Sequence, residues 1–233
     1  MITAKKNKFI GRLFSLYHKR LLKKHFYAVH INGLQNIQAL NPSLPVIMYA
    51  NHSNWWDGFI AYFLTNRVLK KDDYLMMDIK QMMKYSFFKF IGVFSVDREK
   101  PAEAIRSISY AADLIRGSER YLWIFPQGEM FPQDKRPLNF YSGISKIAEK
   151  AGNVYLIPVC FRYEFLMEQR PEIFISIGSP DIFSGKNESS LPEKLRSKLE
   201  SQLDILRDDV VYGKTENFIT IFKGKDSRNK SFD

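Results

Sequence analysis

A histidine and an aspartate stand five residues apart in the stretch NHSNWWD, which covers residues 51–57. A histidine acts as a general base near neutral pH when a carboxylate holds one ring nitrogen, because the other nitrogen is then free to accept a proton. On a straight helix, residues five positions apart point about 140° away from each other. His52 and Asp57 can therefore pair only if the chain turns sharply between them.

The same stretch also has the form of a helix start. Asn54 is a favourable N-cap residue, and Asp57 follows it by three positions, which is the spacing of a capping box. The apolar run before it predicts a strand over 45–51. His52 would then lie at the carboxyl end of a strand, where α/β sheets usually bind their ligands. Spacing alone favours the structural role, and the catalytic pair stays open.

Short apolar runs alternate with helical patterns along the chain. Strands are predicted at 27–32, 45–51, 73–77, 93–96, 120–125, 154–161 and 172–177, and helices near 57–66, 79–90, 101–116, 141–151 and 192–211. Residues 180–190 have the composition of a loop. The alternation predicts an α/β fold with a mostly parallel central sheet flanked by helices.

The net charge of +10 is concentrated near the N-terminus. Residues 1–30 hold eight Lys or Arg and no Asp or Glu, and apolar residues recur at helical spacing over 5–27. A basic amphipathic helix of this kind favours an anionic membrane surface; the alternative is a helix docked on its own domain with its lysines in water. We therefore expect a membrane-association helix (1–26), an α/β domain (27–222) and a polar tail (223–233).

Composition argues against several kinds of site and partner. No stretch approaches the roughly 18–20 apolar residues that span a bilayer, so we expect a peripheral protein on the cytoplasmic face of the cell membrane. The single Cys160 rules out an internal disulfide. The four histidines lack metal-ligand spacing, so no metal is predicted, and His18, His25 and His30 are expected in solvent or at an interface. No nucleic-acid motif accompanies the basic helix, so no nucleic-acid partner is expected.

Four blocks in order resemble a known family. NHSNWWD resembles the N-H-x-x-x-x-D motif of the glycerolipid acyltransferases, the family of bacterial 1-acylglycerol-3-phosphate acyltransferases. GVFSVDR (92–98) resembles the family's G-x-x-F-I-D-R block, FPQGE (125–129) resembles F-P-E-G-T, and IPV (157–159) resembles its V-P-V strand. The resemblance covers roughly residues 27–180, and four blocks in order are far more specific than one.

The resemblance implies acyl transfer from a thioester to a lipid hydroxyl. His52 would take the proton of the acceptor hydroxyl, and Asp57 would orient His52. The donor would be acyl-CoA or acyl carrier protein, with no other cofactor, and the acceptor a lysophosphatidic acid-like lipid. Backbone N–H groups near Gly128 are candidate donors to the oxyanion. The substrate-binding residues implied by the blocks are Asn51, Asp97, Arg98, Gln127, Gly128 and Glu129.

The third block departs from the family pattern. Gln127, Glu129 and Met130 stand where the family has Glu, Thr and Arg, so a cation is lost and an anion gained. Two unit charges about 5 Å apart interact by about 3 kcal/mol at an effective dielectric near 20. Glu129 would then disfavour a phosphate acceptor unless it points away or pairs with Arg98. The alternative acceptor is a non-phosphate lipid such as a glycolipid, an aminolipid or a glycosylated isoprenoid.

Two other functional classes stay open from the sequence. One is a non-enzymatic lipid-binding module on the same fold. The other is a thioester or lipid hydrolase, although the chain has no G-x-S-x-G elbow for a serine nucleophile. The Met- and Phe-rich stretch 74–94 is expected mainly in the core, with a second lipid-contacting surface as the alternative.

Overall fold

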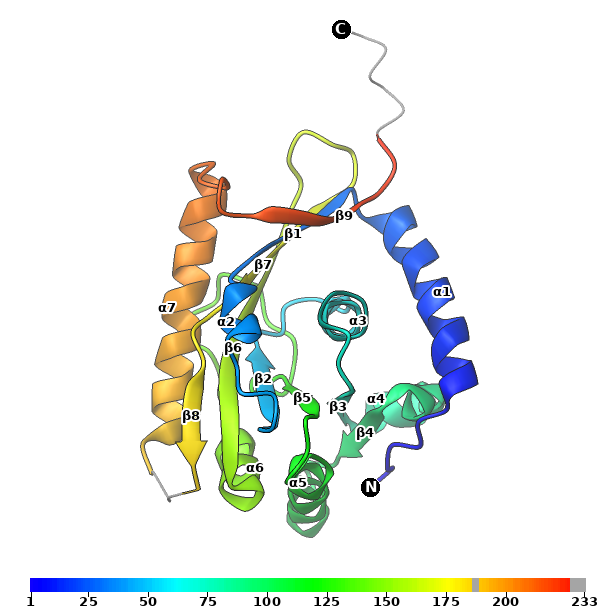
Figure 1. Cartoon of the computed structure of the whole chain (residues 1–233), viewed down its shortest axis with the longest axis vertical. Helices are drawn as coiled ribbons and strands as arrows, with labels where there is room; N and C mark the ends of the chain where they lie inside the picture. The colour runs from blue at the N-terminus through cyan, green and yellow to red at the C-terminus, as the bar shows by residue number, and fades with distance from the viewer. Residues whose placement is uncertain (186–188, 227–233) are drawn as a thin grey trace, which may run out of the picture.

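The computed structural model describes residues 1–185 and 189–226. Within those ranges the strands form one nine-stranded sheet in the order β4-β3-β5-β2-β6-β7-β1-β9, with β8 paired to β6 (Figure 1). The strands are β1 (Ala28–Asn32), β2 (Val46–Ala50), β3 (Asp73–Asp78), β4 (Val93–Val96), β5 (Tyr121–Ile124), β6 (Asn153–Glu164), β7 (Glu172–Ile177), β8 (Asp181–Ser184) and β9 (Ile219–Lys223). The helices are α1 (Lys8–His25), α2 (Gln35–Gln38), α3 (Asp57–Phe63), α4 (Ile79–Lys84), α5 (Pro101–Ile115), α6 (Gly143–Ala151) and α7 (Leu191–Val211). A π-helix (Leu64–Leu69) continues α3, and a 3-10 helix (Ser86–Ile91) follows α4.

The sheet has helices on both faces. All five residues of β2 are buried, as expected for a strand covered on both sides. Because side chains alternate along a strand, Val46 and Met48 join the core under α1 and α3, whereas Ile47 and Tyr49 join the core under α5, α6 and α7. Figure 1 shows α1 and α7 on opposite sides of the molecule.

The predicted α/β fold with a mostly parallel sheet is confirmed. The pairs β1–β7, β2–β5, β2–β6, β3–β4 and β3–β5 are parallel, and β1–β9, β6–β7 and β6–β8 are antiparallel. The prediction of a loop over 180–190 is wrong for β8, and β9 was not expected. Both are largely exposed strands held by backbone pairing, so they carry little apolar signal.

The N-terminal segment is tied to the domain. Asn7 caps α1 by accepting from the N–H groups of Phe9 and Ile10. Before it, Ile2 exchanges hydrogen bonds with Ser95 of β4. Leu22 of α1 is fully buried. The helix is therefore docked on its own domain along one face. The division at residue 26 stays a prediction, and residues 227–233 of the expected tail lie outside the described ranges.

Two histidines differ from the expectation that they lie in solvent or at an interface. His18 of α1 is only 2% exposed and packs against the rings of Phe14 and Tyr62. Burial, followed by the charge of Arg67, lowers the pKa of His18 to about 4. His30 places Nε2 2.6 Å from a carboxylate oxygen of Glu172. The prediction is therefore wrong for these two residues, because their partners come from distant segments, and it holds for the exposed His25.

Replacing His18 with Phe should change the pH dependence of stability. The folded-state pKa of His18 is about 4, below its ordinary 6.5. The unfolded chain therefore binds more protons between these values, and this residue's contribution to stability grows as pH rises through that window. We compare the free energy of unfolding of His18→Phe with that of wild type, measured in urea. We expect this difference to be roughly 2–3 kcal/mol more favourable to the variant at pH 4.5 than at pH 7.5. The same difference at both pH values would contradict the buried, neutral state of His18.

Candidate active site

Three of the four sequence blocks meet at one edge of the sheet, whereas the fourth lies within β6, where it pairs with β2. Strands β2, β3, β4 and β5 run parallel to one another, so the residues that follow their carboxyl ends lie along the same edge. His52 follows β2, the turn 125–129 follows β5, and Arg98 follows β4. This edge is where open α/β sheets usually bind their ligands.

His52 and Asp57 form the expected pair. The Nδ1 atom of His52 lies 2.8 Å from Oδ2 of Asp57. Since a carboxylate only accepts hydrogen bonds, Nδ1 carries the proton and Nε2 is the basic nitrogen of the neutral ring. The His52 side chain is 24% exposed, whereas that of Asp57 is 0% exposed. The pair therefore combines a buried acceptor with a base that solvent or substrate can reach.

The turn between them is built by the same carboxylate. Oδ2 of Asp57 also accepts hydrogen bonds from the backbone N–H groups of Ser53 at 2.7 Å and Asn54 at 2.8 Å. In return, Oδ1 of Asn54 accepts from the N–H of Trp56 at 3.1 Å. The helix-start interpretation is thus compatible with the pair, because the turn into α3 is what brings Asp57 back to His52.

The backbone of His52 is held from both sides. Its N–H donates to Oε1 of Gln127 at 2.6 Å, and its carbonyl accepts from the N–H of Phe131 at 2.9 Å. The imidazole stacks on the ring of Phe125, with centroids 4.7 Å apart. Gln127 is only 2% exposed. Its side chain therefore positions His52, and its predicted role in binding substrate stays a prediction.

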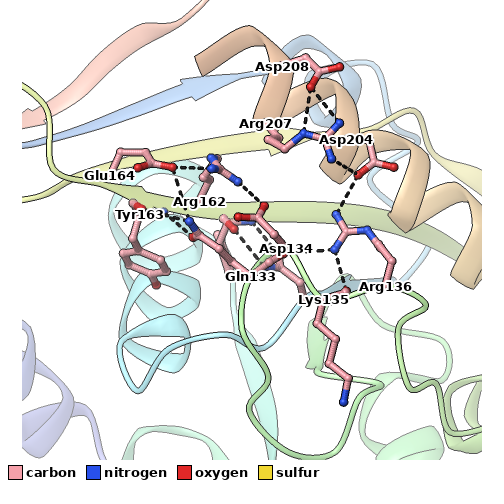
Figure 2. A network of polar contacts seen from close by, with 12 residues as sticks. Gln133, Asp134, Lys135, Arg136, Arg162, Tyr163, Glu164, Asp204, Arg207 and Asp208 are labelled. Atoms are coloured by element: carbon pink, nitrogen blue, oxygen red, sulfur yellow. Dashed lines mark hydrogen bonds and ion pairs between the residues drawn. The ribbon is translucent and has the colours of Figure 1, made fainter. Parts of the chain in front are cut away.

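Two side-chain amides extend the pairing of β6 beyond the end of β2. Asn51 donates from Nδ2 to the carbonyl of Phe161 at 2.9 Å and accepts on Oδ1 from its N–H at 2.8 Å. In the same way, Oε1 of Gln133 accepts from the N–H of Tyr163 at 3.2 Å, and Nε2 of Gln133 donates to the carbonyl of Tyr163 at 3.4 Å (Figure 2). The contacts of Asn51, a buried residue, favour a structural role, and its assignment to substrate binding stays a prediction.

Tyr163 is a site residue that the sequence blocks did not indicate. Its hydroxyl donates to Oδ1 of Asp57 at 2.6 Å. Burial and the neighbouring Asp57 charge raise the pKa of Tyr163 well above its ordinary value, so the hydroxyl stays protonated and donates. Tyr163 lies four residues beyond the fourth block, and no local pattern marks it as a partner of Asp57.

Arg98 lies against the turn of the third block. Gly128 has φ +72°, and a Cβ at this position would collide with the Arg98 guanidinium. The same guanidinium lies 5.2 Å from the ring centroid of Tyr141 and 3.6 Å from Oδ2 of Asp78. A glycine is therefore favoured by the backbone conformation, and its missing Cβ leaves the space that the Arg98 guanidinium occupies. The N–H of Gly128 donates to the carbonyl of Phe125 at 3.0 Å, so the turn already uses this candidate oxyanion donor.

The remaining predicted residues lie at the periphery of the site. Glu129 is exposed, and in the described ranges Arg98 pairs with Asp78 rather than with Glu129. Asp97 accepts a hydrogen bond from the N–H of Glu99 at 3.2 Å, which stabilises the turn into α5. The expected pairing of Glu129 with Arg98 is therefore not seen, and its alternative, a side chain pointing away, fits the exposure.

The described residues contain no group of three His, Cys, Asp or Glu side chains that could hold a metal ion. Likewise, no helix in these ranges is long and apolar enough to cross a membrane.

Comparisons with known proteins agree with the resemblance seen in the blocks. The 1-acyl-sn-glycerol-3-phosphate acyltransferase of Saccharomyces cerevisiae is 27% identical over 121 residues, which cover 49% of this chain and 38% of the yeast protein. The chain thus matches about two fifths of that relative's length. The crystal structure of the 1-acyl-sn-glycerophosphate (LPA) acyltransferase PlsC from Thermotoga maritima has the same fold, with a TM-score of 0.61 at 17% identity over 86% of this chain and 80% of that one.

A sequence profile of the family described as Acyltransferase matches residues 28–162, which is more than half of the chain. This range includes the His52–Asp57 pair, Arg98 and the turn at Gly128. The chain therefore belongs to the Acyltransferase family.

Proposed function

We propose that the protein transfers a fatty acyl chain from a thioester to the hydroxyl of a lysophosphatidic acid-like lipid. The observation that carries this proposal is the hydrogen bond between Nδ1 of His52 and the buried Asp57, at the sheet edge where Arg98 lies against the Gly128 turn. A base and a cation for an anionic headgroup are the two groups that this reaction needs. The relatives named above add support, since both are acyltransferases of this type by name.

The chemistry requires one proton acceptor and no covalent enzyme intermediate. Nε2 of His52 takes the proton as the acceptor oxygen attacks the thioester carbonyl, and Asp57 stabilises the resulting imidazolium. The new C–O bond forms, the C–S bond breaks, and the proton on Nε2 passes to the leaving thiolate. The donor is an acyl group on coenzyme A or on acyl carrier protein, and no further cofactor takes part.

The acceptor is proposed to carry a phosphate that Arg98 binds. Its side chain is 32% exposed, and its ion pair with Asp78 is long, at 3.6 Å. The guanidinium can therefore exchange this contact for a phosphate. The exposed Met130 favours the second candidate, a non-phosphate lipid acceptor, because it stands where the family pattern has an arginine and supplies no cation for a phosphate.

The protein is proposed to sit on the cytoplasmic face of the membrane through α1 and the residues beside it. Four apolar residues of α1 are 52–70% exposed, namely Phe9, Leu13, Leu16 and Tyr17. Trp55, in the His52 turn, is 48% exposed and Phe87 is 45% exposed. Ring contacts through Phe59 and Phe14 connect these two residues, with centroids 4.6, 6.1 and 6.2 Å apart. Phe14 and Phe59 are themselves buried, so α1 is packed through them onto the turn that holds the base.

Replacing His52 should remove the base. We expect His52→Ala to lower the rate of acyl transfer by roughly 10²–10⁴-fold, measured as phosphatidic acid formed from lysophosphatidic acid and an acyl thioester, while the unfolding midpoint stays close to wild type. His25→Ala is the matched control, because His25 is exposed. A His52→Ala rate within a few-fold of wild type would remove the base assignment.

Replacing Arg98 should separate the two acceptors. We expect Arg98→Ala to raise the KM for lysophosphatidic acid by roughly 10- to 100-fold, the loss of one charged hydrogen-bonding contact, with little change in kcat. The KM for monoacylglycerol should not change. Arg106→Ala, which removes an exposed arginine of α5, is the control. Efficient turnover of glycosylated or neutral lipid alcohols, with no Arg98 effect, would favour the non-phosphate acceptor instead.

Polar substitutions on α1 should weaken membrane binding. Deleting the helix is a poor test, because α1 also supplies the fully buried Leu22. We expect the triple change Phe9→Ser, Leu13→Ser and Leu16→Ser to weaken binding to phosphatidylglycerol vesicles by roughly 10- to 100-fold, measured by co-sedimentation.

The control for this experiment is the pair Ile205→Ser and Val211→Ser, two residues of α7 that are 59% and 62% exposed. Helix α7 lies on the opposite side of the molecule from α1 (Figure 1). Salt should weaken wild-type binding, because the basic residues of α1 act through screened charges. Equal binding by the α1 variant and wild type would exclude this face as the membrane surface.

A further inference from the structure

The carboxylate of Asp57 has two oxygens with different partners. Oδ2 accepts from Nδ1 of His52 and from the N–H groups of Ser53 and Asn54. Oδ1 accepts from the hydroxyl of Tyr163 at 2.6 Å, and no other hydrogen bond to Oδ1 occurs in the described residues. We propose that Tyr163 is a positioning residue of the active site, which fixes the Asp57 carboxylate and moderates its bond to His52. This inference rests on the proposed function.

A carboxylate with no solvent exposure needs every one of its donors. Asp57 is 0% exposed, and a buried oxygen that loses its partner keeps the full desolvation cost. Without the Tyr163 hydroxyl, Oδ1 would have no donor, and rotation of the carboxylate would weaken the turn that Oδ2 holds together. Tyr163 thus fixes the orientation of the group that fixes His52.

Tyr163 is suited to this role because its hydroxyl stays a donor. Burial raises its pKa well above the ordinary value, and the negative charge of Asp57 raises it further. The hydroxyl therefore remains protonated at neutral pH. It donates a charge-assisted hydrogen bond, which is shorter and stronger than one between neutral groups.

The tyrosine is itself held by the loop that follows the third block. The amide of Gln133 pairs with both backbone groups of Tyr163. Arg162 and Glu164, the two neighbours of Tyr163 in β6, pair with each other (Figure 2). Arg162 also pairs with Asp134 of the loop at 2.7 Å. The Tyr163 ring lies 6.1 Å from that of Phe26 at the end of α1. The loop 131–141 and strand β6 thus set the position of the hydroxyl against Asp57.

Two of the donors on Asp57, His52 and Tyr163, compete for the negative charge of the carboxylate. A hydrogen bond from Tyr163 spreads the negative charge of the carboxylate, so that less of it acts on His52. Removing the hydroxyl should strengthen the attraction between Asp57 and the imidazolium. The acid limb of the kcat/KM profile should then move to higher pH, because His52 keeps its proton more readily. A purely structural role would lower activity without moving this limb.

The test compares Tyr163→Phe with Tyr49→Phe. Both changes remove the hydroxyl of a largely buried tyrosine, but that of Tyr49 has no hydrogen-bond partner within the described residues. We expect Tyr163→Phe to lower kcat by roughly 10- to 100-fold, with KM values close to wild type and the acid limb at higher pH. Tyr49→Phe should match wild type in kcat, in KM and in the position of the acid limb. An unmoved acid limb in Tyr163→Phe would overturn the proposal.

A second measurement does not depend on turnover. The Nδ1–H proton of His52, observed by NMR in ¹⁵N-histidine-labelled protein, should move downfield in Tyr163→Phe and stay in place in Tyr49→Phe. If no acyl transfer is found in wild type but this shift occurs, the proposed function fails and the role of Tyr163 stands.

If Tyr163→Phe does not fold, 3,5-difluorotyrosine at position 163 keeps the ring and makes its hydroxyl a stronger donor. This replacement should move the acid limb to lower pH and the proton resonance upfield, opposite to the shifts expected for Tyr163→Phe. An unchanged resonance would overturn the proposal.

Discussion

The site depends on one fully buried carboxylate. Asp57 has no exposed surface, and a charge in that position is tolerated only when hydrogen bonds replace the lost water. Its donors come from three places: the ring of His52, the backbone at Ser53 and Asn54, and the hydroxyl of Tyr163. A single group therefore fixes the base, the turn into α3 and strand β6. A change in any one of these three alters the hydrogen bonds of Asp57 to the other two.

The surrounding structure meets this constraint with side chains that replace backbone pairing. Strand β2 ends at Ala50, whereas its partner β6 continues to Glu164. Asn51 and Gln133 satisfy the free backbone edge of β6 with their amides, and Gln127 does the same for the N–H of His52. Gln127 of the third block supplies the acceptor that the His52 N–H needs without placing a negative charge there.

Local sequence patterns predict what is held by local contacts. The apolar runs and amphipathic stretches predict the parallel sheet. The five-residue spacing with a helix start leaves the His52–Asp57 pair open, and the resemblance of the four blocks to the acyltransferase pattern is what favours it. Tyr163 lies 106 residues from Asp57, so only the fold brings it to the carboxylate. The same reason explains His18 and His30, whose burial and partners come from distant segments. Strands β8 and β9 carry few buried side chains, so their pairing leaves almost no trace in the sequence.

The central claim is that an acceptor hydroxyl, deprotonated by His52, attacks the thioester directly. The most direct measurement is the release of free thiol from an acyl thioester by purified wild-type protein, with and without lysophosphatidic acid, alongside mass-spectrometric detection of the lipid product. Direct transfer predicts one phosphatidic acid formed for each thiol released, and no release above background without the acceptor. Thiol release without acceptor would indicate a hydrolase, and no release under either condition would indicate a lipid-binding module; either result would contradict the account.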